Sequence, residues 1–159
     1  RRAVNGLVRS QGIRSFHSSS RRMVAIENFD VFSMEQADIY FQGYGDGGFR
    51  LQDHNVLYSL FLLPHSAFLW NVPTIDQLTT DSLSILEVIP PIELLLIGTG
   101  KENVPIPDEI THYLNNLGIK MIEVQSTSPA VGTFNILAQE KRNFGALMFP
   151  IDPTIMLET

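Results

Sequence analysis

The sequence predicts an α/β fold in which antiparallel hairpins precede a C-terminal βαβαβ unit, with the strands forming a central mixed sheet. From residue 92 to residue 149, short apolar runs alternate with segments of helical period, the pattern of parallel strands joined by helices. Between residues 38 and 72, glycine- and proline-containing turns separate apolar segments, which is typical of antiparallel hairpins. The chain has 159 residues, of which 44% are hydrophobic, enough for one domain with a substantial core.

The first 22 residues differ from the rest of the chain in composition. They contain six arginines, five serines and no acidic residue, whereas residues 23–159 carry 5 basic and 17 acidic residues, a net charge of −12. A basic, serine-rich leader without acidic residues is typical of mitochondrial presequences. We therefore expect residues 1–23 to be a presequence and residues 24–159 to form a single domain with a short C-terminal tail.

The leader also contains a pattern of two-step processing. A first cut after Ser15 would expose Phe16, and removal of the following octapeptide would leave Val24 as the mature start. The alternatives are a disordered basic arm and a nucleic-acid-binding tail. The acidic body argues against nucleic acid as a partner, because phosphate binding requires a cationic surface.

The first predicted hairpin surrounds a glycine-rich loop. Residues 38–42 and 49–51 are expected to be its strands, and the glycines of the loop at 43–48 are expected to supply positive φ. A glycine-rich loop can also cradle phosphate, but this one carries Asp46 and lies between strands instead of opening a helix. The turn interpretation is therefore favoured.

Two further strands and a short helix complete the N-terminal half. Residues 55–63 form a long apolar segment, which the pattern predicts to be one strand, and residues 67–72 form the next strand after a turn at Pro64. A short helix over residues 80–87 follows, with Thr80 or Asp81 as its N-cap.

The βαβαβ unit begins with residues 92–97, an apolar run predicted to be a strand buried on both faces at the centre of the sheet. Residues 120–125 and 146–149 are the next two strands. The first helix starts near Pro107 and ends at Gly118, and its apolar positions recur at helical spacing. These positions are Ile110, Tyr113, Leu114 and Leu117.

The second helix is expected to start at Pro129, with Thr127 or Ser128 as its N-cap. Lys141 and Arg142 follow its last apolar positions and complement the negative end of the helix dipole.

The turn Gly98-Thr99-Gly100 after the buried strand is the one candidate for binding a cofactor. Such turns place backbone N–H groups against a pyrophosphate in dinucleotide-binding folds. The third glycine of that pattern is replaced by Asn103, and Lys101 lacks the Ser or Thr of a phosphate-binding loop. We therefore predict no cofactor, and retain Gly98, Thr99, Gly100 and Thr127 as candidate ligands.

The sequence lacks the residues that several kinds of catalytic or metal site require. Without cysteine the chain has no disulfide, thiol nucleophile, iron–sulfur ligand or cysteine zinc site. The four histidines, His17, His54, His65 and His112, have no spacing that would hold a metal, and no G-x-S-x-G motif is present. We predict no catalytic residues and no metal site, and no apolar run is long enough to span a bilayer.

Four segments together resemble the Mth938-like domain family over residues 36–150. They are Leu62-Leu63-Pro64-His65-Ser66 with Trp70-Asn71-Val72, Ile97-Gly98-Thr99-Gly100, Val124-Gln125-Ser126-Thr127-Ser128-Pro129-Ala130, and Thr133-Phe134-Asn135-Ile136-Leu137 with Glu140 and Arg142. The resemblance implies a three-layer α/β fold around a central mixed sheet.

The similarity to mitochondrial members of this family also implies a function. It implies a non-catalytic matrix factor that helps to build respiratory complex I by binding early intermediates of its quinone module. The implied partners are complex I assembly factor 4 and quinone-module subunits, which would hold the protein at the periphery of the inner membrane.

Three classes of function therefore remain open: an interaction protein, a small-molecule or nucleotide-binding module, and an unrecognised hydrolase or oxidoreductase. A binding module would use the crevice where the Gly98–Gly100 turn meets residues 126–128, at the carboxyl ends of the parallel strands. Convergent hydrogen-bond donors in that crevice would favour a ligand, and a filled or flat surface would favour the interaction protein.

Overall fold

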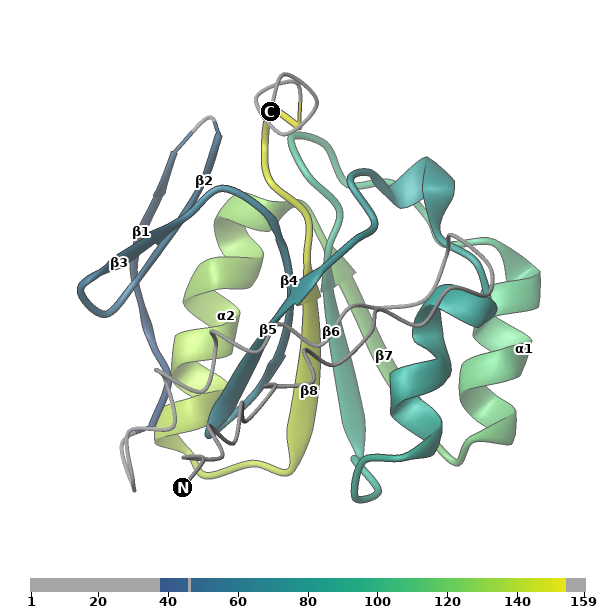
Figure 1. The fold of residues 1–159 in the computed structure, drawn as a ribbon. Helices are drawn as coiled ribbons and strands as arrows, with labels where there is room; N and C mark the ends of the chain where they lie inside the picture. The colour runs from purple at the N-terminus through teal and green to yellow at the C-terminus, as the bar shows by residue number, and fades with distance from the viewer. Residues whose placement is uncertain (1–37, 46, 154–159) are drawn as a thin grey trace, which may run out of the picture.

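A computed structural model of the chain describes residues 38–45 and 47–153, so the predicted presequence and the end of the C-terminal tail lie outside the described residues (Figure 1). The strands are β1 (Phe41–Gly45), β2 (Gly48–Leu51), β3 (His54–Val56), β4 (Ser59–Leu63), β5 (Ser66–Trp70), β6 (Leu94–Gly98), β7 (Met121–Gln125) and β8 (Phe144–Met148). The helices are the 3-10 helices η2 (Ile75–Gln77) and η3 (Asp81–Glu87) and the α-helices α1 (Asp108–Asn116) and α2 (Thr127–Gln139).

The predicted mixed sheet is present, with strand order β5-β4-β8-β6-β7. Strands β6, β7 and β8 are parallel, and β4 is antiparallel to both β5 and β8. The βαβαβ prediction is therefore confirmed, and β6 lies between its two parallel partners. The middle strand of all five is β8 and not β6, which corrects the prediction that residues 92–97 form the centre of the sheet. Strand β8 starts at Phe144, two residues earlier than predicted, and is buried along its whole length.

The apolar segment 55–63 is not one strand, which corrects the prediction. Its first part belongs to β3, in a separate antiparallel sheet of order β1-β2-β3, and its second part is β4 in the five-stranded sheet. Leu57 and Tyr58 join the two sheets and are 48% and 43% exposed. The run looked continuous because both parts are apolar, although they bury their side chains in different sheets.

Three glycines of the first hairpin, Gly43, Gly45 and Gly48, do not have positive φ, contrary to the prediction. Positive φ occurs instead at Gly100 and Gly118, at 102° and 90°. Gly48 is required for a different reason: a Cβ there would lie 2.1 Å from the Val56 carbonyl oxygen. The close approach of β2 and β3, and not a left-handed turn, therefore excludes a side chain at this position.

The five-stranded sheet has a buried hydrophobic cluster on each face. On one face, Leu96 of β6 packs in a cluster with Phe134 of α2 and Phe41 of the small sheet. On the other face, the neighbouring residue Leu95 packs in a cluster with Ile110 of α1. Successive strand residues point to opposite faces, so β6 is covered on both sides, and Figure 1 shows α1 and α2 on opposite sides of the sheet.

Both α-helices are present, with starts that differ from the prediction. Pro107 is the N-cap of α1 instead of its first residue, and Gly118 ends the helix with positive φ as expected. Helix α2 begins at Thr127 with Ser126 as its N-cap, two residues before the predicted start at Pro129. A proline at the third helical position is compatible with a helix because the N–H groups of the first turn have no partner within the helix.

Candidate functional site

The structure brings the four candidate ligand residues together at the carboxyl ends of β6 and β8. Gly98 ends β6, and Thr127 is the first residue of α2. The Thr127 hydroxyl accepts a hydrogen bond from the Gly100 N–H (2.9 Å) and donates to the Phe149 carbonyl oxygen (2.6 Å). The Thr127 N–H donates to the Gly100 carbonyl oxygen (2.8 Å). This fully buried threonine therefore joins the turn to the chain that leaves β8.

Thr99 is held in a similar way on the other side of the turn. Its N–H donates to the Gln125 carbonyl oxygen (2.9 Å), and its hydroxyl lies 2.5 Å from the Glu102 carbonyl oxygen. The same hydroxyl accepts a hydrogen bond from the Val104 N–H (3.1 Å). The N–H groups of Thr99, Gly100 and Thr127, which a bound phosphate would need, all donate within the protein.

The space at the turn is also filled. A Cβ on Gly98 would lie 2.7 Å from Met148 Sδ, 3.1 Å from Thr127 Oγ1 and 3.2 Å from Ala130 Cβ. Glycine therefore allows α2 and β8 to approach the end of β6 closely. The crevice in which ligands bind in many open α/β sheets is occupied here by the protein's own side chains and hydrogen bonds.

A shallow hollow of about 370 Å³ lies beside this turn. It is lined by Asn103, Pro105, Ile106 and Val124, so it runs between the loop after β6 and the end of β7. None of these four side chains is titratable. The hollow offers apolar surface and an amide, and its lining has no group for acid–base chemistry.

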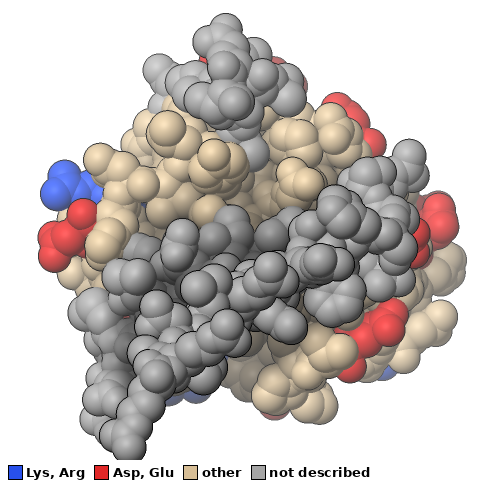
Figure 2. Space-filling view, in the orientation of Figure 1, with Lys and Arg blue, Asp and Glu red and all other residues tan. Residues whose placement is uncertain are grey.

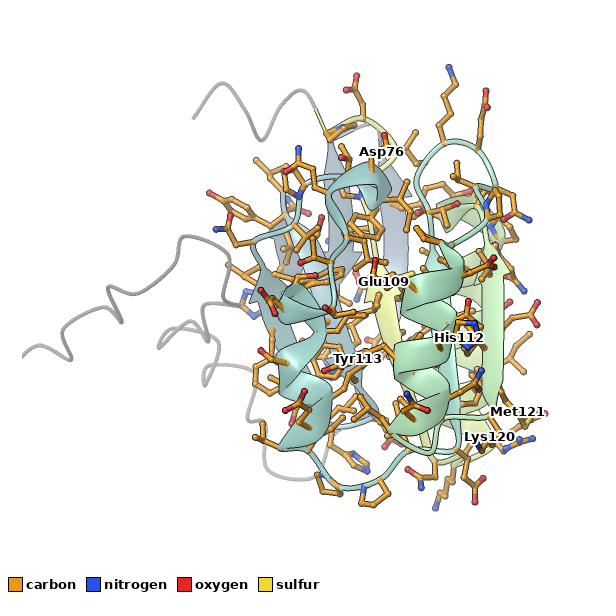
Figure 3. All side chains as sticks on the ribbon, turned by 90° about the vertical axis from the view of Figure 1, so that its right-hand side faces the viewer. Asp76, Glu109, His112, Tyr113, Lys120 and Met121 are labelled. Carbon is orange, nitrogen blue, oxygen red and sulfur yellow. The ribbon has the colours of Figure 1, made fainter. Side chains whose placement is uncertain are left out.

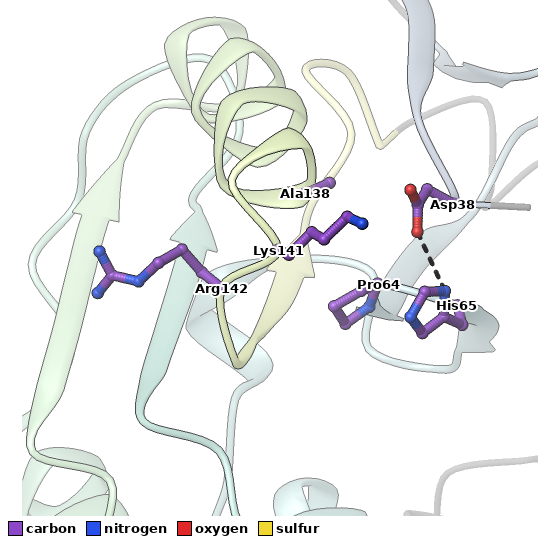
Figure 4. Close-up of a pocket in the computed structure, with 6 residues that line it drawn as sticks. All are labelled: Asp38, Pro64, His65, Ala138, Lys141 and Arg142. Atoms are coloured by element: carbon purple, nitrogen blue, oxygen red, sulfur yellow. Dashed lines mark ion pairs between the residues drawn. The ribbon is translucent and has the colours of Figure 1, made fainter.

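A second hollow, of about 330 Å³, lies at the other end of the sheet (Figure 4). It is lined by Asp38, Pro64, His65, Ala138, Lys141 and Arg142. His65 Nδ1 lies 3.2 Å from Asp38 Oδ1, and their side chains are 70% and 52% exposed. An ion pair this exposed contributes little energy. In Figure 4 the Lys141 side chain extends toward Asp38 and His65, whereas Arg142 points away.

The histidines and acidic residues do not converge. Within residues 38–45 and 47–153, no three histidine, aspartate or glutamate side chains form a group that could hold a metal ion.

His112 is exposed on α1, and its neighbour Tyr113 donates a hydrogen bond to Glu87 of η3 (2.6 Å). Burial and this hydrogen bond raise the pKa of Tyr113 above its ordinary value. This tyrosine joins η3 to α1.

Asn135 has a role that local sequence patterns did not reveal. Its side-chain amide accepts from the Phe41 N–H and donates to the Phe41 carbonyl oxygen, both at 2.8 Å. The amide thus pairs with β1 as a neighbouring strand would, and fixes the small sheet to α2. Asn135 belongs to one of the segments that resemble the Mth938-like family, but its partner lies 94 residues away, so no local period could identify the contact.

Comparison with known proteins agrees with this architecture. The family described as "Protein of unknown function (DUF498/DUF598)" matches residues 41–149. A solution NMR structure of a Bordetella pertussis protein, described as a Mth938-like domain, aligns with a TM-score of 0.64 over 76% of this chain and 91% of that chain. At 21% sequence identity this similarity shows a shared fold.

Curated relatives carry a name related to respiration. A Homo sapiens protein named NADH dehydrogenase [ubiquinone] 1 alpha subcomplex assembly factor 3 is 35% identical over 113 residues, which are 70% of this chain and 61% of that protein. The chain thus spans less than two thirds of the human relative. The Danio rerio protein of the same name is 30% identical over 145 residues, or 91% of this chain and 82% of that protein. The chain is thus similar to these relatives named assembly factor 3, and it belongs to the DUF498/DUF598 family.

Proposed function

We propose that the protein is a non-catalytic assembly factor for mitochondrial respiratory complex I that acts by binding other proteins. The observation that carries this proposal is the 30% identity to the Danio rerio assembly factor, because that similarity extends over 91% of the chain. The mode of action follows from the proposed role, since an assembly factor holds intermediates through surfaces and needs no reaction of its own.

The geometry of the turn supports the same proposal. The N–H groups of Thr99, Gly100 and Thr127 already donate to acceptors within the protein. A nucleotide would have to break these hydrogen bonds and displace packed side chains at Gly98. This cost makes a nucleotide-binding role for the turn unfavourable.

The proposed partners are complex I assembly factor 4 and subunits of the quinone module, bound as early intermediates. We propose the mitochondrial matrix as the compartment, with attachment to the periphery of the inner membrane through these partners. Among the helices of the described residues, none is both long and apolar enough to cross a membrane. The described residues include five basic and twelve acidic side chains, which favours protein over nucleic acid as the partner.

A complementation experiment tests the proposal. Cells that lack their own assembly factor 3 would express the full chain with a C-terminal tag, and native electrophoresis would measure assembled complex I. We expect recovery of complex I and copurification of the tagged chain with quinone-module subunits and assembly factor 4. Matched expression of an unrelated matrix protein is the control, and absence of recovery with a stable, imported chain would contradict the proposal.

A ligand titration separates this proposal from the binding-module alternative. Thermal melting of the purified chain would be followed with increasing NADH, NADPH, ATP or a quinone analogue. No saturable shift is expected, because the donors of the turn are already occupied. A saturable shift that Thr99→Val abolishes, without changing the melting temperature of the free protein, would instead assign ligand binding to the turn.

We also propose that residues 1–23 act as a cleaved presequence, on the basis of their arginine-rich, acid-free composition. N-terminal sequencing of the protein recovered from mitochondria should then begin at Val24. A mature chain that still begins at Arg1 would contradict this assignment.

A further inference from the structure

The edge strands of the two sheets differ in whether their outer backbone groups are hydrogen-bonded to another element. In the three-stranded sheet, β1 is an edge strand, and the Asn135 side chain occupies the N–H and carbonyl groups of Phe41. In the five-stranded sheet, β7 is an edge strand, and among the described residues no strand lies beside it except β6. Open strand edges are templates for pairing with another chain, and proteins usually block them with proline, bulges or covering segments.

Strand β7 has neither a proline nor a bulge, and Glu123 is its one charged residue. Its five residues contain no proline, and its register with β6 is regular from Leu94↔Met121 to Gly98↔Gln125, without a bulge. Among the described residues, no strand pairs with the outer edge of β7.

The direction of those groups follows from one hydrogen bond. The Gln125 carbonyl oxygen accepts from the Thr99 N–H, so the backbone polar groups of Gln125 face β6. Because these groups alternate in direction along a strand, those of Glu123 also face β6, and those of Ile122 and Val124 face outward. A sixth strand could pair with the N–H and carbonyl groups of these two residues.

The surface beside the edge suits an extended peptide. Val124 lines the hollow of about 370 Å³, together with Pro105 and Ile106, and Ile122 is half-buried against the cluster on the α1 face. In strand addition, main-chain hydrogen bonds provide affinity while alternate side chains enter neighbouring pockets. The hollow would receive one apolar side chain of the added strand.

Charge indicates which kind of strand this edge would accept. Glu123 is exposed on β7 itself, and Glu102 adjoins Asn103 in the lining of the hollow. The carboxylate of Glu123 accepts a hydrogen bond from Gln125 Nε2 (3.0 Å), and Lys120 lies beside Met121 at the start of the strand (Figure 3). Figure 2 shows acidic side chains on the side of the molecule where α1 lies. Two copies paired antiparallel about Glu123 would oppose like charges, which is unfavourable. A basic side chain opposite Glu123 would instead complement this carboxylate.

We propose that the outer edge of β7 accepts an extended, lysine- or arginine-bearing segment of a partner protein as a sixth strand. The segment carries apolar side chains at alternate positions, which face Val124 and the hollow, and basic side chains that face Glu123. This inference rests on the proposed function only in taking the partner to be a protein of the assembly intermediate.

Strand addition can be measured with the full chain and a defined probe. The probe is a fluorescent eight-residue peptide of alternating lysine and valine, with a counterpart in which glutamate replaces lysine. Fluorescence anisotropy should show saturable binding of the lysine peptide only. Amide hydrogen exchange should be fast at Ile122 and Val124 in the free protein and should slow when the lysine peptide is bound, because these N–H groups become donors.

Two pairs of variants test the edge. Val124→Pro removes an outward N–H, a change that edge strands tolerate, whereas Val124→Thr keeps both the N–H and the branched shape. Glu123→Lys reverses a charge on the edge, and Glu140→Lys makes the same change on an exposed residue after α2. Val124→Pro and Glu123→Lys should weaken binding about tenfold or more, and the two controls should bind as the unchanged protein does.

Several results would overturn the inference. They are equal binding by Val124→Pro, equal binding of the glutamate peptide, and protection of Ile122 and Val124 in a dimer of the free chain, which would make a second copy the occupant. If Val124→Pro does not fold, the binding of the lysine peptide to Glu123→Lys and the hydrogen-exchange measurement still test whether β7 accepts a strand.

The complementation cells distinguish this failure from failure of the proposed function. Copurification that Glu123→Lys leaves unchanged would reject the edge while keeping the assembly role. Absence of copurification with the unchanged chain would reject the assembly role, while the peptide assay would still test the edge.

Discussion

At the scale of single residues, Thr127 links three segments through one buried hydroxyl. Replacing it by valine keeps the shape but leaves the Gly100 N–H and the Phe149 carbonyl oxygen without this partner. We expect Thr127→Val to lower the free energy of unfolding by about 1–3 kcal/mol, measured by denaturant titration. Thr111→Val is the control, because the Thr111 hydroxyl makes only an exposed, 3.4 Å hydrogen bond to Pro107. Equal losses in the two variants would contradict this role of Thr127.

For Ser59, also at the scale of single residues, we expect that removing the hydroxyl does not lower stability. Its hydroxyl is the one buried side-chain polar atom without a hydrogen-bond partner in the described part of the chain. Burying such a group costs free energy, so Ser59→Ala should leave the stability unchanged or raise it. Thermal melting checks this outcome, and a loss of more than about 1 kcal/mol would show that the hydroxyl is in fact bonded.

At the scale of elements, Asn135 fixes α2 to β1. Asn135→Ala removes two hydrogen bonds and exposes the backbone of Phe41 at the edge of the small sheet. We expect faster amide exchange at Phe41 and a loss of about 1–3 kcal/mol in the free energy of unfolding. Asn116→Ala, at an exposed position at the end of α1, should have little effect on either measurement. Unchanged exchange at Phe41 would show that the small sheet is held by packing alone.

At the scale of the whole molecule, stability depends on a sheet that is buried on both faces. Leu95 is fully buried in β6, and an unpaired carboxylate there would cost several kcal/mol against a total stability of about 5–15 kcal/mol. Leu95→Asp should therefore abolish soluble protein, whereas Asn116→Asp should express and melt as the unchanged chain does. Similar melting of both variants would contradict the burial of β6 on both faces of the sheet.

The sequence by itself determined the order and type of most elements. Local signals were sufficient, because helical period, short apolar runs and turn residues such as Gly118 each depend on near neighbours along the chain. The βαβαβ unit from β6 to β8 could therefore be predicted, as could the resemblance to the Mth938-like family. Predicted starts were wrong by two residues at α2 and β8, because packing and not a local signal sets these boundaries.

Only the tertiary structure decided which segments meet. The apolar run 55–63 divides between two sheets, since its halves bury their side chains in different places. Thr127 closes the Gly98–Gly100 turn instead of capping a helix, and Asn135 pairs with Phe41 across 94 residues. Each contact joins groups far apart in sequence, where no period or spacing signals the partner. The same cause leaves β7 at an edge: strand order results from how the crossovers pack, which the sequence of elements alone does not specify.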